Sequence, residues 1–257
     1  MILANKYLKQ NFILINLLFL FILILSPVQA QSDPLEIHVT TDEWPPFRMI
    51  KDDKYTGIDF DLLREVAKRM DRKLVLKQHP WSRGLTNMKQ GHVDLMSGLA
   101  KTEQRALFLD YTSDSYFKCS TVFYVRKGDA KLIENYEDLK NQRVGFVAGS
   151  AYFTRFDTDE SLAKYSVTSE EQLIKMLVYN RFKVIIGTDC QADYDITRLG
   201  YSDKIEKAIY KPNNSVDLYI GISKKSELSK EINKINNIIR EIIQEGKIQE
   251  FSQQYYK

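Results

Sequence analysis

The stretch that decides the fold begins with Leu35-Glu-Ile-His-Val-Thr-Thr41, in which apolar and polar residues alternate and several are β-branched. This pattern predicts a strand. After Gly57, apolar residues recur at the i, i+3, i+4 and i+7 spacing of an amphipathic helix. These residues are Leu63, Val66, Ala67 and Met70. The stretch therefore begins as a strand followed by a helix.

The same alternation continues along the chain. Residues 73–79 predict a second strand, a short helix begins at Trp81 and ends at Gly91, and residues 93–96 predict a third strand. Between the first strand and helix, Trp44-Pro-Pro-Phe47 predicts a rigid loop, because proline fixes φ and has no N–H to donate. This order of elements predicts an α/β fold with a parallel sheet covered on both faces.

Two extended stretches, residues 116–126 and 216–222, frame a second set of alternating elements. No Gly/Ser-rich or Pro-rich linker separates the two sets. Two αβ sets joined by extended strands predict two lobes with a hinge that can close over a ligand.

Within the second set, residues 143–147 and 183–187 predict buried strands. Ser169 and Gln172 form a capping-box pattern, which marks the start of a helix. After the second extended stretch, residues 226–244 predict a long amphipathic helix.

The first thirty residues have the pattern of a secretory signal peptide. Lys6 and Lys9 form a short positive region, residues 12–25 are apolar except for Asn16, and residues 28–30 are a Val-Gln-Ala cleavage site. We expect cleavage after about Ala30. A membrane anchor is the alternative, but the apolar run is shorter than the roughly 20 residues that span a bilayer.

A signal peptide without a following cysteine for lipidation predicts a soluble exported protein. Such a protein would diffuse away from a cell that lacks an outer membrane. The sequence therefore favours the periplasm, with secretion to the medium as the second possibility.

The chain has 257 residues, of which 37 are basic, 34 are acidic and 28% are charged, an ordinary globular composition. This excludes a disordered chain, a collagen-like fibre and a disulfide-dense miniprotein. Without Lys6 and Lys9 of the signal peptide, which has no acidic residue, 35 basic and 34 acidic residues remain. A nearly neutral chain gives no electrostatic case for binding nucleic acid or an anionic membrane.

Cysteine and histidine are few and dispersed. Cys119 and Cys190 could form a disulfide in an oxidising compartment, but the sequence does not fix their Cα separation and leaves the pairing open. His38, His79 and His92 give no cluster with metal-ligand spacing. We expect neither a metal nor a cofactor.

Seven short motifs occur along the mature chain in the order typical of one protein family. They are Trp44-Pro-Pro-Phe47, Gly57-Ile-Asp-Phe-Asp61, Gly91-His-Val-Asp94, Ser97-Gly-Leu-Ala-Lys-Thr-Glu-Gln-Arg105, Leu109-Asp-Tyr-Thr-Ser113, Gly149-Ser150 and the closing segment 246–256. In these motifs the chain resembles the family 3 periplasmic solute-binding proteins, the amino-acid receptors of ABC importers.

The resemblance implies a two-lobe α/β fold of the periplasmic binding protein-like type II class. Each lobe would be a mostly parallel sheet flanked by helices, and two hinge strands would join the lobes. Lobe 1 would comprise residues 33–118 and 218–257, and lobe 2 residues 119–217.

The resemblance also implies a carboxylate site. In this family an arginine after a Gly-x-(Ser/Thr)-x-Thr run holds the ligand α-carboxylate, and Arg105 stands there. A planar guanidinium can bind a carboxylate through two parallel charge-assisted hydrogen bonds. The alternative is a surface arginine on a short helix capped by Thr102. Gly98 fits a close approach of backbone to ligand. Ala100 stands where amino-acid binders usually supply a hydroxyl, which removes one carboxylate contact.

Three aromatic residues are candidates for stacking on the ligand or lying over its ammonium group. Trp81 matches the family's cleft aromatic before the second helix. Trp44 and Phe47 lie in the loop at the carboxyl end of the first strand, where open α/β sheets bind ligands. Packing within the lobe is the alternative for all three, and it explains Phe47 at least as well.

Gly149 and Ser150 lie at a predicted turn from a strand into a helix. Exposed N–H groups and the helix dipole would make this turn an anion site, and simple helix capping is the alternative. Arg83, Lys118 and Tyr152 are further residues that could face the cleft.

The partner of a ligand amino group is less clearly marked. The family places an acid just after the strand equivalent to residues 184–186, and here Thr188 holds that position, followed by Asp189. Asp189 could still reach the cleft, and Asp42 or Glu43 could substitute from lobe 1.

The predicted function is capture of a small polar ligand, an amino acid or related carboxylate, and its delivery to an ABC transporter permease. We expect a monomer without a catalytic site. Two alternatives stay open. One is a periplasmic dehydratase-like enzyme on the same scaffold, for which His79 is the one histidine placed near the expected cleft. The other is a free ligand-sensing module.

Overall fold

The computed structural model describes residues 35–256, so the predicted signal peptide, residues 1–30, lies outside the described residues. Within residues 35–256, no helix combines the length and the apolar character that a membrane span needs.

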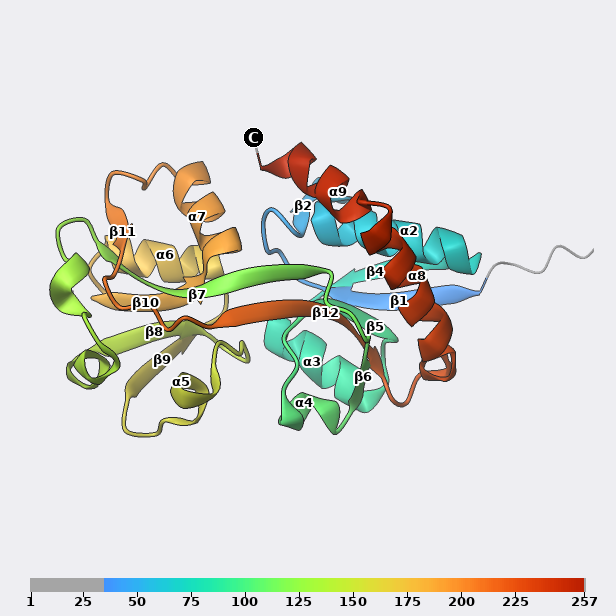
Figure 1. The fold of residues 1–257 in the computed structure, drawn as a ribbon, viewed down its shortest axis with the longest axis horizontal. Helices are drawn as coiled ribbons and strands as arrows, with labels where there is room; N and C mark the ends of the chain where they lie inside the picture. Colours follow the sequence, from blue (N-terminus) through green and yellow to red (C-terminus); the bar gives the residue numbers. More distant parts are fainter. Residues whose placement is uncertain (1–34, 257) are drawn as a thin grey trace, which may run out of the picture. The chain divides into compact units, whose positions relative to one another are not determined.

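Lobe 1 contains the first αβ set and the C-terminal helices. Its elements are β1 (Glu36–Thr41), β2 (Met49–Lys51), β3 (Lys54–Thr56), α2 (Ile58–Met70), β4 (Lys73–Gln78), α3 (Trp81–Gln90), β5 (Leu95–Leu99), α4 (Glu103–Ala106), β6 (Leu109–Tyr111), α8 (Ile232–Gln244) and α9 (Lys247–Tyr255). As predicted, β1 pairs in parallel with β4 and β5. Helices α2 and α3 cover opposite faces of the sheet (Figure 1).

Asp94 shifts two of the predicted boundaries. Its carboxylate accepts the His38 N–H at 2.7 Å and the Ser226 hydroxyl at 2.6 Å, which holds Asp94 in a turn. The strand predicted at residue 93 therefore begins at Leu95. The Ser226 hydroxyl also accepts the N–H of Leu228, and a short 3-10 helix precedes α8 where one continuous helix was predicted.

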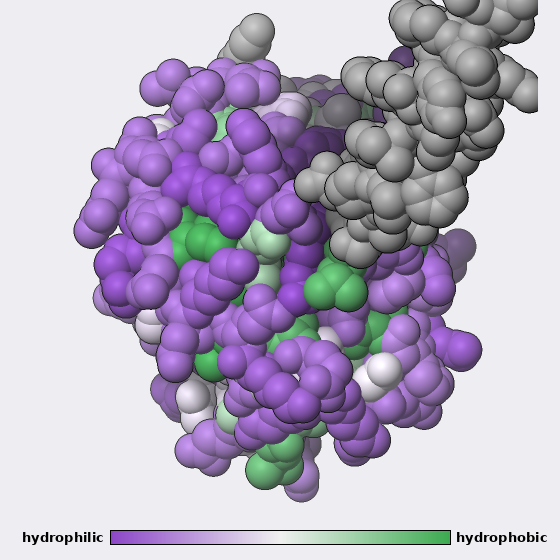
Figure 2. All heavy atoms as spheres, turned by 90° about the vertical axis from the view of Figure 1, so that its right-hand side faces the viewer, coloured by the Kyte–Doolittle hydropathy of each residue, from purple (hydrophilic) through white to green (hydrophobic). Residues whose placement is uncertain are grey.

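Helix α8 closes the core of lobe 1. Its isoleucines at helical spacing are Ile235, Ile238, Ile239 and Ile242, and all four are buried among residues of α2 and β1. Each such side chain contributes about 1.5–3 kcal/mol by leaving water. Where described residues are visible in Figure 2, their surface is mostly hydrophilic, with small separate hydrophobic patches.

Lobe 2 contains the second αβ set. Its elements are β8 (Arg143–Val147), α5 (Thr154–Thr158), β9 (Ala163–Val167), α6 (Glu170–Val178), β10 (Val184–Thr188), α7 (Asp189–Arg198) and β11 (Ile205–Lys207). β8 pairs in parallel with β9 and β10. Helix α6 begins where the capping-box pattern predicted, and the Ser169 hydroxyl accepts the Gln172 N–H at 3.3 Å. The reciprocal bond differs from a capping box, because the Gln172 side-chain oxygen accepts the Thr168 N–H at 3.2 Å. Separate hydrophobic cores cover the two faces of this sheet.

Two long antiparallel strands, β7 (Phe117–Arg126) and β12 (Ser215–Ser223), belong to both lobes. Residues 117–120 of β7 pair with residues 215–218 of β12. Beyond this shared segment, β12 continues along β5 and β6, while β7 continues along β10 and β11. The lobe boundaries predicted within these two strands stay a prediction.

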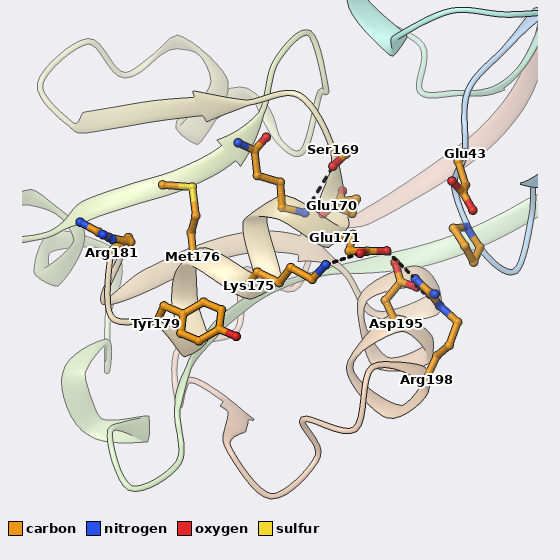
Figure 3. A pocket seen from close by; sticks show the side chains of 12 residues that line it. Glu43, Ser169, Glu170, Glu171, Lys175, Met176, Tyr179, Arg181, Asp195 and Arg198 are labelled. Carbon is orange, nitrogen blue, oxygen red and sulfur yellow. Dashed lines mark hydrogen bonds and ion pairs between the residues drawn. The ribbon is translucent and has the colours of Figure 1, made fainter.

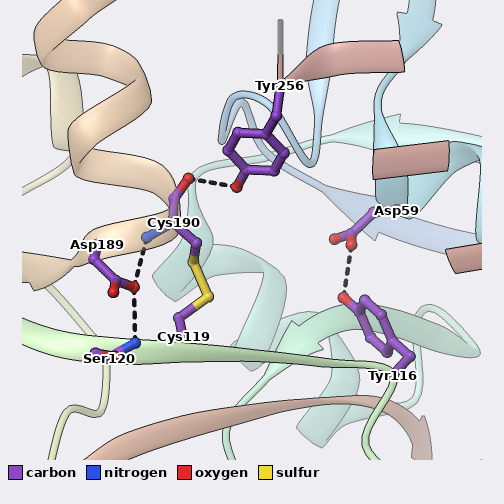
Figure 4. The surroundings of a disulfide bond; sticks show 7 residues. All are labelled: Asp59, Tyr116, Cys119, Ser120, Asp189, Cys190 and Tyr256. Carbon is purple, nitrogen blue, oxygen red and sulfur yellow. Dashed lines mark hydrogen bonds between the residues drawn. A yellow bond between two sulfur atoms is a disulfide. The ribbon is translucent and has the colours of Figure 1, made fainter. Parts of the chain in front are cut away.

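Cys119 of β7 and Cys190 of α7 form a disulfide, with their Cα atoms 5.5 Å apart (Figure 4). Beside it, the Asp189 carboxylate accepts the backbone N–H of Ser120 at 2.8 Å and that of Cys190 at 2.7 Å. The disulfide and these hydrogen bonds join the first turn of α7 to the shared segment of β7.

Replacing both cysteines, Cys119→Ser with Cys190→Ser, should lower the free energy of unfolding. The bond closes a loop with a sequence separation of 71 residues, and loss of that constraint on the unfolded chain costs about 4 kcal/mol. Urea unfolding measures the difference. A reducing agent should destabilise the wild type to a similar extent and leave the double variant unchanged. Equal free energies of unfolding for the wild type and the double variant without reducing agent would contradict a structural role for the disulfide.

Candidate functional site

A cavity of about 60 Å³, called the cleft below, lies between the two αβ sets. Most of its lining residues lie at or just beyond the carboxyl ends of β1, β5, β8, β9 and β10, as expected for open α/β sheets. Val216 and Leu218 of β12 add an apolar wall. The other lining residues are Asp42, Glu43, Trp44, Arg48, Trp81, Gly98, Ala100, Arg105, Val147, Ser150, Ala151, Tyr152, Thr168, Ser169, Glu170 and Thr188.

The loop after β1 places Trp44 beside Arg48. The two residues exchange backbone hydrogen bonds, with N···O distances of 2.8 and 2.9 Å. This ring of backbone bonds closes the predicted Pro-Pro loop and holds the Arg48 guanidinium 4.9 Å from the centre of the Trp44 ring. Both side chains therefore face the cleft from one rigid loop.

Arg48 is the centre of a buried ion network in lobe 1. Its guanidinium donates to the Asp42 carboxylate at 2.7 Å and to the Asp59 carboxylate at 2.6 Å. The Asp59 carboxylate also accepts the hydroxyls of Ser97 at 2.9 Å and Tyr116 at 2.6 Å. Burial raises the pKa of Asp42, while the Arg48 charge opposes that rise. Two carboxylates thus neutralise this cation, which is only 3% exposed.

Gly98 leaves room for this network. Its φ is +74°, and a Cβ atom there would lie 2.5 Å from the Arg48 guanidinium. Any side chain at this position would therefore displace Arg48. The sequence predicted a close approach between backbone and ligand at Gly98. In the structure, the group that lies close to Gly98 is the Arg48 guanidinium.

Arg105 reaches the cleft from α4, whose first turn is capped by the Thr102 hydroxyl. The Arg105 guanidinium donates to the carbonyls of Ala100 at 2.8 Å and Gly149 at 2.7 Å. Trp81 donates its indole N–H to the same Gly149 carbonyl at 3.1 Å. Burial lowers the pKa of Arg105. Among residues 35–256 no carboxylate pairs with this guanidinium, so it is a buried cation suited to an anionic partner.

The structure brings six of the nine predicted binding residues together in the cleft lining, which does not include Phe47, Gly149 and Asp189. Arg105, Trp81, Trp44, Gly98, Ala100 and Ser150 line the cleft, as do Asp42 and Glu43. Phe47 does not, because it is fully buried between Trp44 and Phe117, with ring centroids 4.5 and 5.0 Å away. The packing alternative is therefore the correct one for Phe47.

Asp189 is also outside the cleft lining. Its carboxylate accepts two backbone N–H groups beside the disulfide, and Figure 4 shows it directed toward β7. The interpretation that Asp189 reaches the cleft is wrong in this structure. Thr188, the residue before it, is the one whose side chain lines the cleft.

The turn at Gly149 and Ser150 does not lead directly into a helix. Helix α5 begins at Thr154 and has only five residues, so the predicted anion site at a helix N-terminus is absent from this turn. Gly149 contributes its carbonyl oxygen instead, which accepts hydrogen bonds from lobe 1.

Sequence reasoning missed two charged residues of the cleft, Arg48 and Glu170. Glu170 is the first residue of α6 and also lines a larger groove of about 600 Å³ between α6, α7 and the loop after β1 (Figure 3). The groove and the cleft share Glu43, Ser169 and Glu170. The position of Glu170 just after β9, at the carboxyl end of a parallel strand, is the signal that could have identified it.

Replacing Arg48 with methionine should destabilise the protein by about 3–5 kcal/mol, because Asp42 and Asp59 would lose the cation that neutralises them. Urea unfolding measures the loss. The matched control is Arg64→Met, which removes an exposed ion pair with Asp61 at 3.0 Å and should cost less than about 1 kcal/mol. Similar small losses in both variants would show that the buried network is not stabilising.

Comparisons with known proteins identify the family. Residues 37–257 match the bacterial extracellular solute-binding proteins, family 3. The probable amino-acid-binding protein YxeM of Bacillus subtilis (strain 168) is 24% identical over 234 residues, which cover 88% of this chain and 86% of the relative.

Solved structures show the same fold. The P235GK mutant of ArgBP from T. maritima has a TM-score of 0.74 at 19% identity, covering 86% of this chain and 95% of that chain. AbpA from Streptococcus pneumoniae, an amino acid ABC transporter substrate-binding protein bound to L-arginine, has a TM-score of 0.73 at 18% identity, with coverages of 86% and 94%. The predicted type II fold is confirmed, and the chain belongs to the bacterial extracellular solute-binding proteins of family 3.

Proposed function

We propose that the protein captures an amino acid or a related small carboxylate in the cleft and delivers it to an ABC importer. The observation that carries this proposal is Arg105, a buried guanidinium that lines the cleft without a carboxylate partner among the described residues. Family membership supports the same function, because the related AbpA is an amino acid ABC transporter substrate-binding protein.

Capture would exchange one set of acceptors for another. The Arg105 guanidinium now donates to two backbone carbonyls. A ligand carboxylate would replace the one from lobe 2, adding an opposite charge and two parallel acceptors. Trp81 lies 5.7 Å from this guanidinium, measured from its ring centre, and would form one wall of the carboxylate site. Closure would be favoured by contacts that the ligand makes with both lobes at once.

The proposal includes the cellular setting. We infer that the signal peptide is removed after about Ala30 and that the mature protein acts in the periplasm as a monomer. The ligand-loaded form would then dock on the membrane permease of the importer. The extracellular character of the family supports export.

A thermal-shift screen of the mature protein against amino acids and other small carboxylates tests the function. A true ligand should raise the melting temperature by mass action. Arg105→Ala should abolish this shift, because the carboxylate would lose its cation. The matched control is Arg83→Ala, an exposed arginine of α3 outside the cleft lining, which should keep the wild-type shift. Retained affinity in Arg105→Ala would exclude the assigned carboxylate site.

One observation favours the dehydratase-like enzyme as a second candidate. Burial, together with the charges of Asp195 and Asp42, raises the pKa of Glu170 to about 8. A carboxyl group that keeps its proton at neutral pH can act as a general acid. Turnover of an arogenate-type substrate by the wild type, abolished in Glu170→Gln, would establish this reading. Binding of an amino acid without turnover would exclude it.

A further inference from the structure

We propose that Glu170 and Thr188 bind a cationic nitrogen of the ligand, either an ammonium or a guanidinium group. This inference rests on the proposed function, in which Arg105 holds the ligand carboxylate. The ligand would then carry both a carboxylate and a cation, and each lobe would bind one of the two charges.

The position expected for this role lacks an available acid. Asp189 uses its carboxylate on the N–H groups of Ser120 and Cys190. It does not line the cleft. A cationic group entering the cleft on the lobe 2 side therefore needs a different carboxylate.

Thr188 provides the first independent sign of a ligand. Its side chain is 7% exposed and lines the cleft, and its hydroxyl oxygen has no hydrogen-bond partner among residues 35–256. The hydroxyl does not cap α7, although Thr188 precedes that helix. Buried hydroxyls in folded proteins nearly always have a partner. An N–H donor on a ligand in the cleft would satisfy it.

Glu170 lines the same cleft as Thr188. Its carboxylate oxygen is 4.0 Å from the position that a Cβ atom would take at Gly187, the residue before Thr188 in β10. The Glu170 side chain is half-buried, and within the described part of the chain it forms neither a hydrogen bond nor an ion pair. It stands where the cleft meets the groove of Figure 3.

The other buried or paired acids around Glu170 already have cations. Asp42 pairs with Arg48 at 2.7 Å, Asp195 with Arg198 at 2.8 Å, and Glu171 with Lys175 at 2.5 Å and Arg198 at 3.2 Å. Glu43, at the opening, is exposed. Among these acids of the described chain, Glu170 is therefore the partly buried carboxyl group without an ion pair, and a ligand cation would provide one.

This arrangement makes binding depend on pH. With its pKa raised to about 8 by burial and by the charges of Asp195 and Asp42, Glu170 holds a proton at neutral pH in the free protein. A bound cation favours the ionised carboxylate, so binding releases this proton. The affinity should therefore increase as the pH rises toward about 8 and should level off above it.

The test uses the mature protein, residues 31–257, and a probe panel of the twenty L-amino acids together with pentanoate and succinate. Thermal shifts identify the tightest-binding probe, and calorimetry gives its affinity at pH 6.5 and pH 8.5. We expect that probe to carry a cationic nitrogen. Glu170→Gln should weaken its binding at least tenfold at pH 8.5 and should remove the increase in affinity with pH. The matched control Glu171→Gln, in the next residue, should bind within twofold of the wild type.

The melting temperature of the ligand-free variant shows whether the substitution itself destabilises the protein. Because the folded-state pKa of Glu170 is raised, its contribution to stability falls as the pH rises from its ordinary pKa toward about 8. Glutamine mimics the protonated carboxyl and avoids this loss. Free Glu170→Gln should therefore melt no lower than the wild type at pH 8.5, and a lower melting temperature would count against the buried, unpaired state of Glu170.

The outcomes separate the two proposals. If no probe binds the wild type, both the proposed function and this inference fail. If a probe is lost in Arg105→Ala but binds Glu170→Gln as tightly as the wild type, only this inference fails. This inference also fails, while the proposed function stands, if pentanoate or succinate binds most tightly, because neither carries a cationic nitrogen.

Discussion

The pairing of β7 with β12 is the constraint on which the rest of the structure depends. Four residues of each strand form the shared segment, and beyond it each strand enters the sheet of a different lobe. Val216 and Leu218 of that segment also line the cleft. The hinge and the apolar wall of the site are therefore the same piece of backbone. A change of register in this pair would move both sheets and the wall of the site together.

Local sequence patterns were sufficient for most of the fold. The apolar spacing after Gly57 predicted α2, and Ser169 with Gln172 predicted the start of α6. The exceptions arise from contacts between distant residues. Asp94 binds His38 and Ser226, which are 56 and 132 positions away, and so moves element boundaries that no local pattern marks.

The site was predicted less completely for the same reason. Arg105 and the two tryptophans were found through ordered motifs. Arg48, in contrast, looks like any surface arginine in sequence, and only the folded chain brings Asp59 to it. Asp189 is the opposite case, because a residue predicted to bind the ligand has a structural role. Its carboxylate accepts the Ser120 N–H of β7, which the disulfide holds close to it. Whether a charged side chain serves the ligand or the scaffold depends on its neighbours in space.

The hydrogen bonds of the Gly149 carbonyl have a consequence for selectivity. In this structure a neutral carbonyl oxygen of lobe 2 accepts from both Arg105 and Trp81 of lobe 1. The protein thus carries an internal competitor that any incoming molecule has to displace. A neutral amide offers Arg105 only an equal exchange, whereas a carboxylate adds an opposite charge and can accept two parallel N–H bonds. Uncharged analogues would therefore fail to displace the Gly149 carbonyl from Arg105.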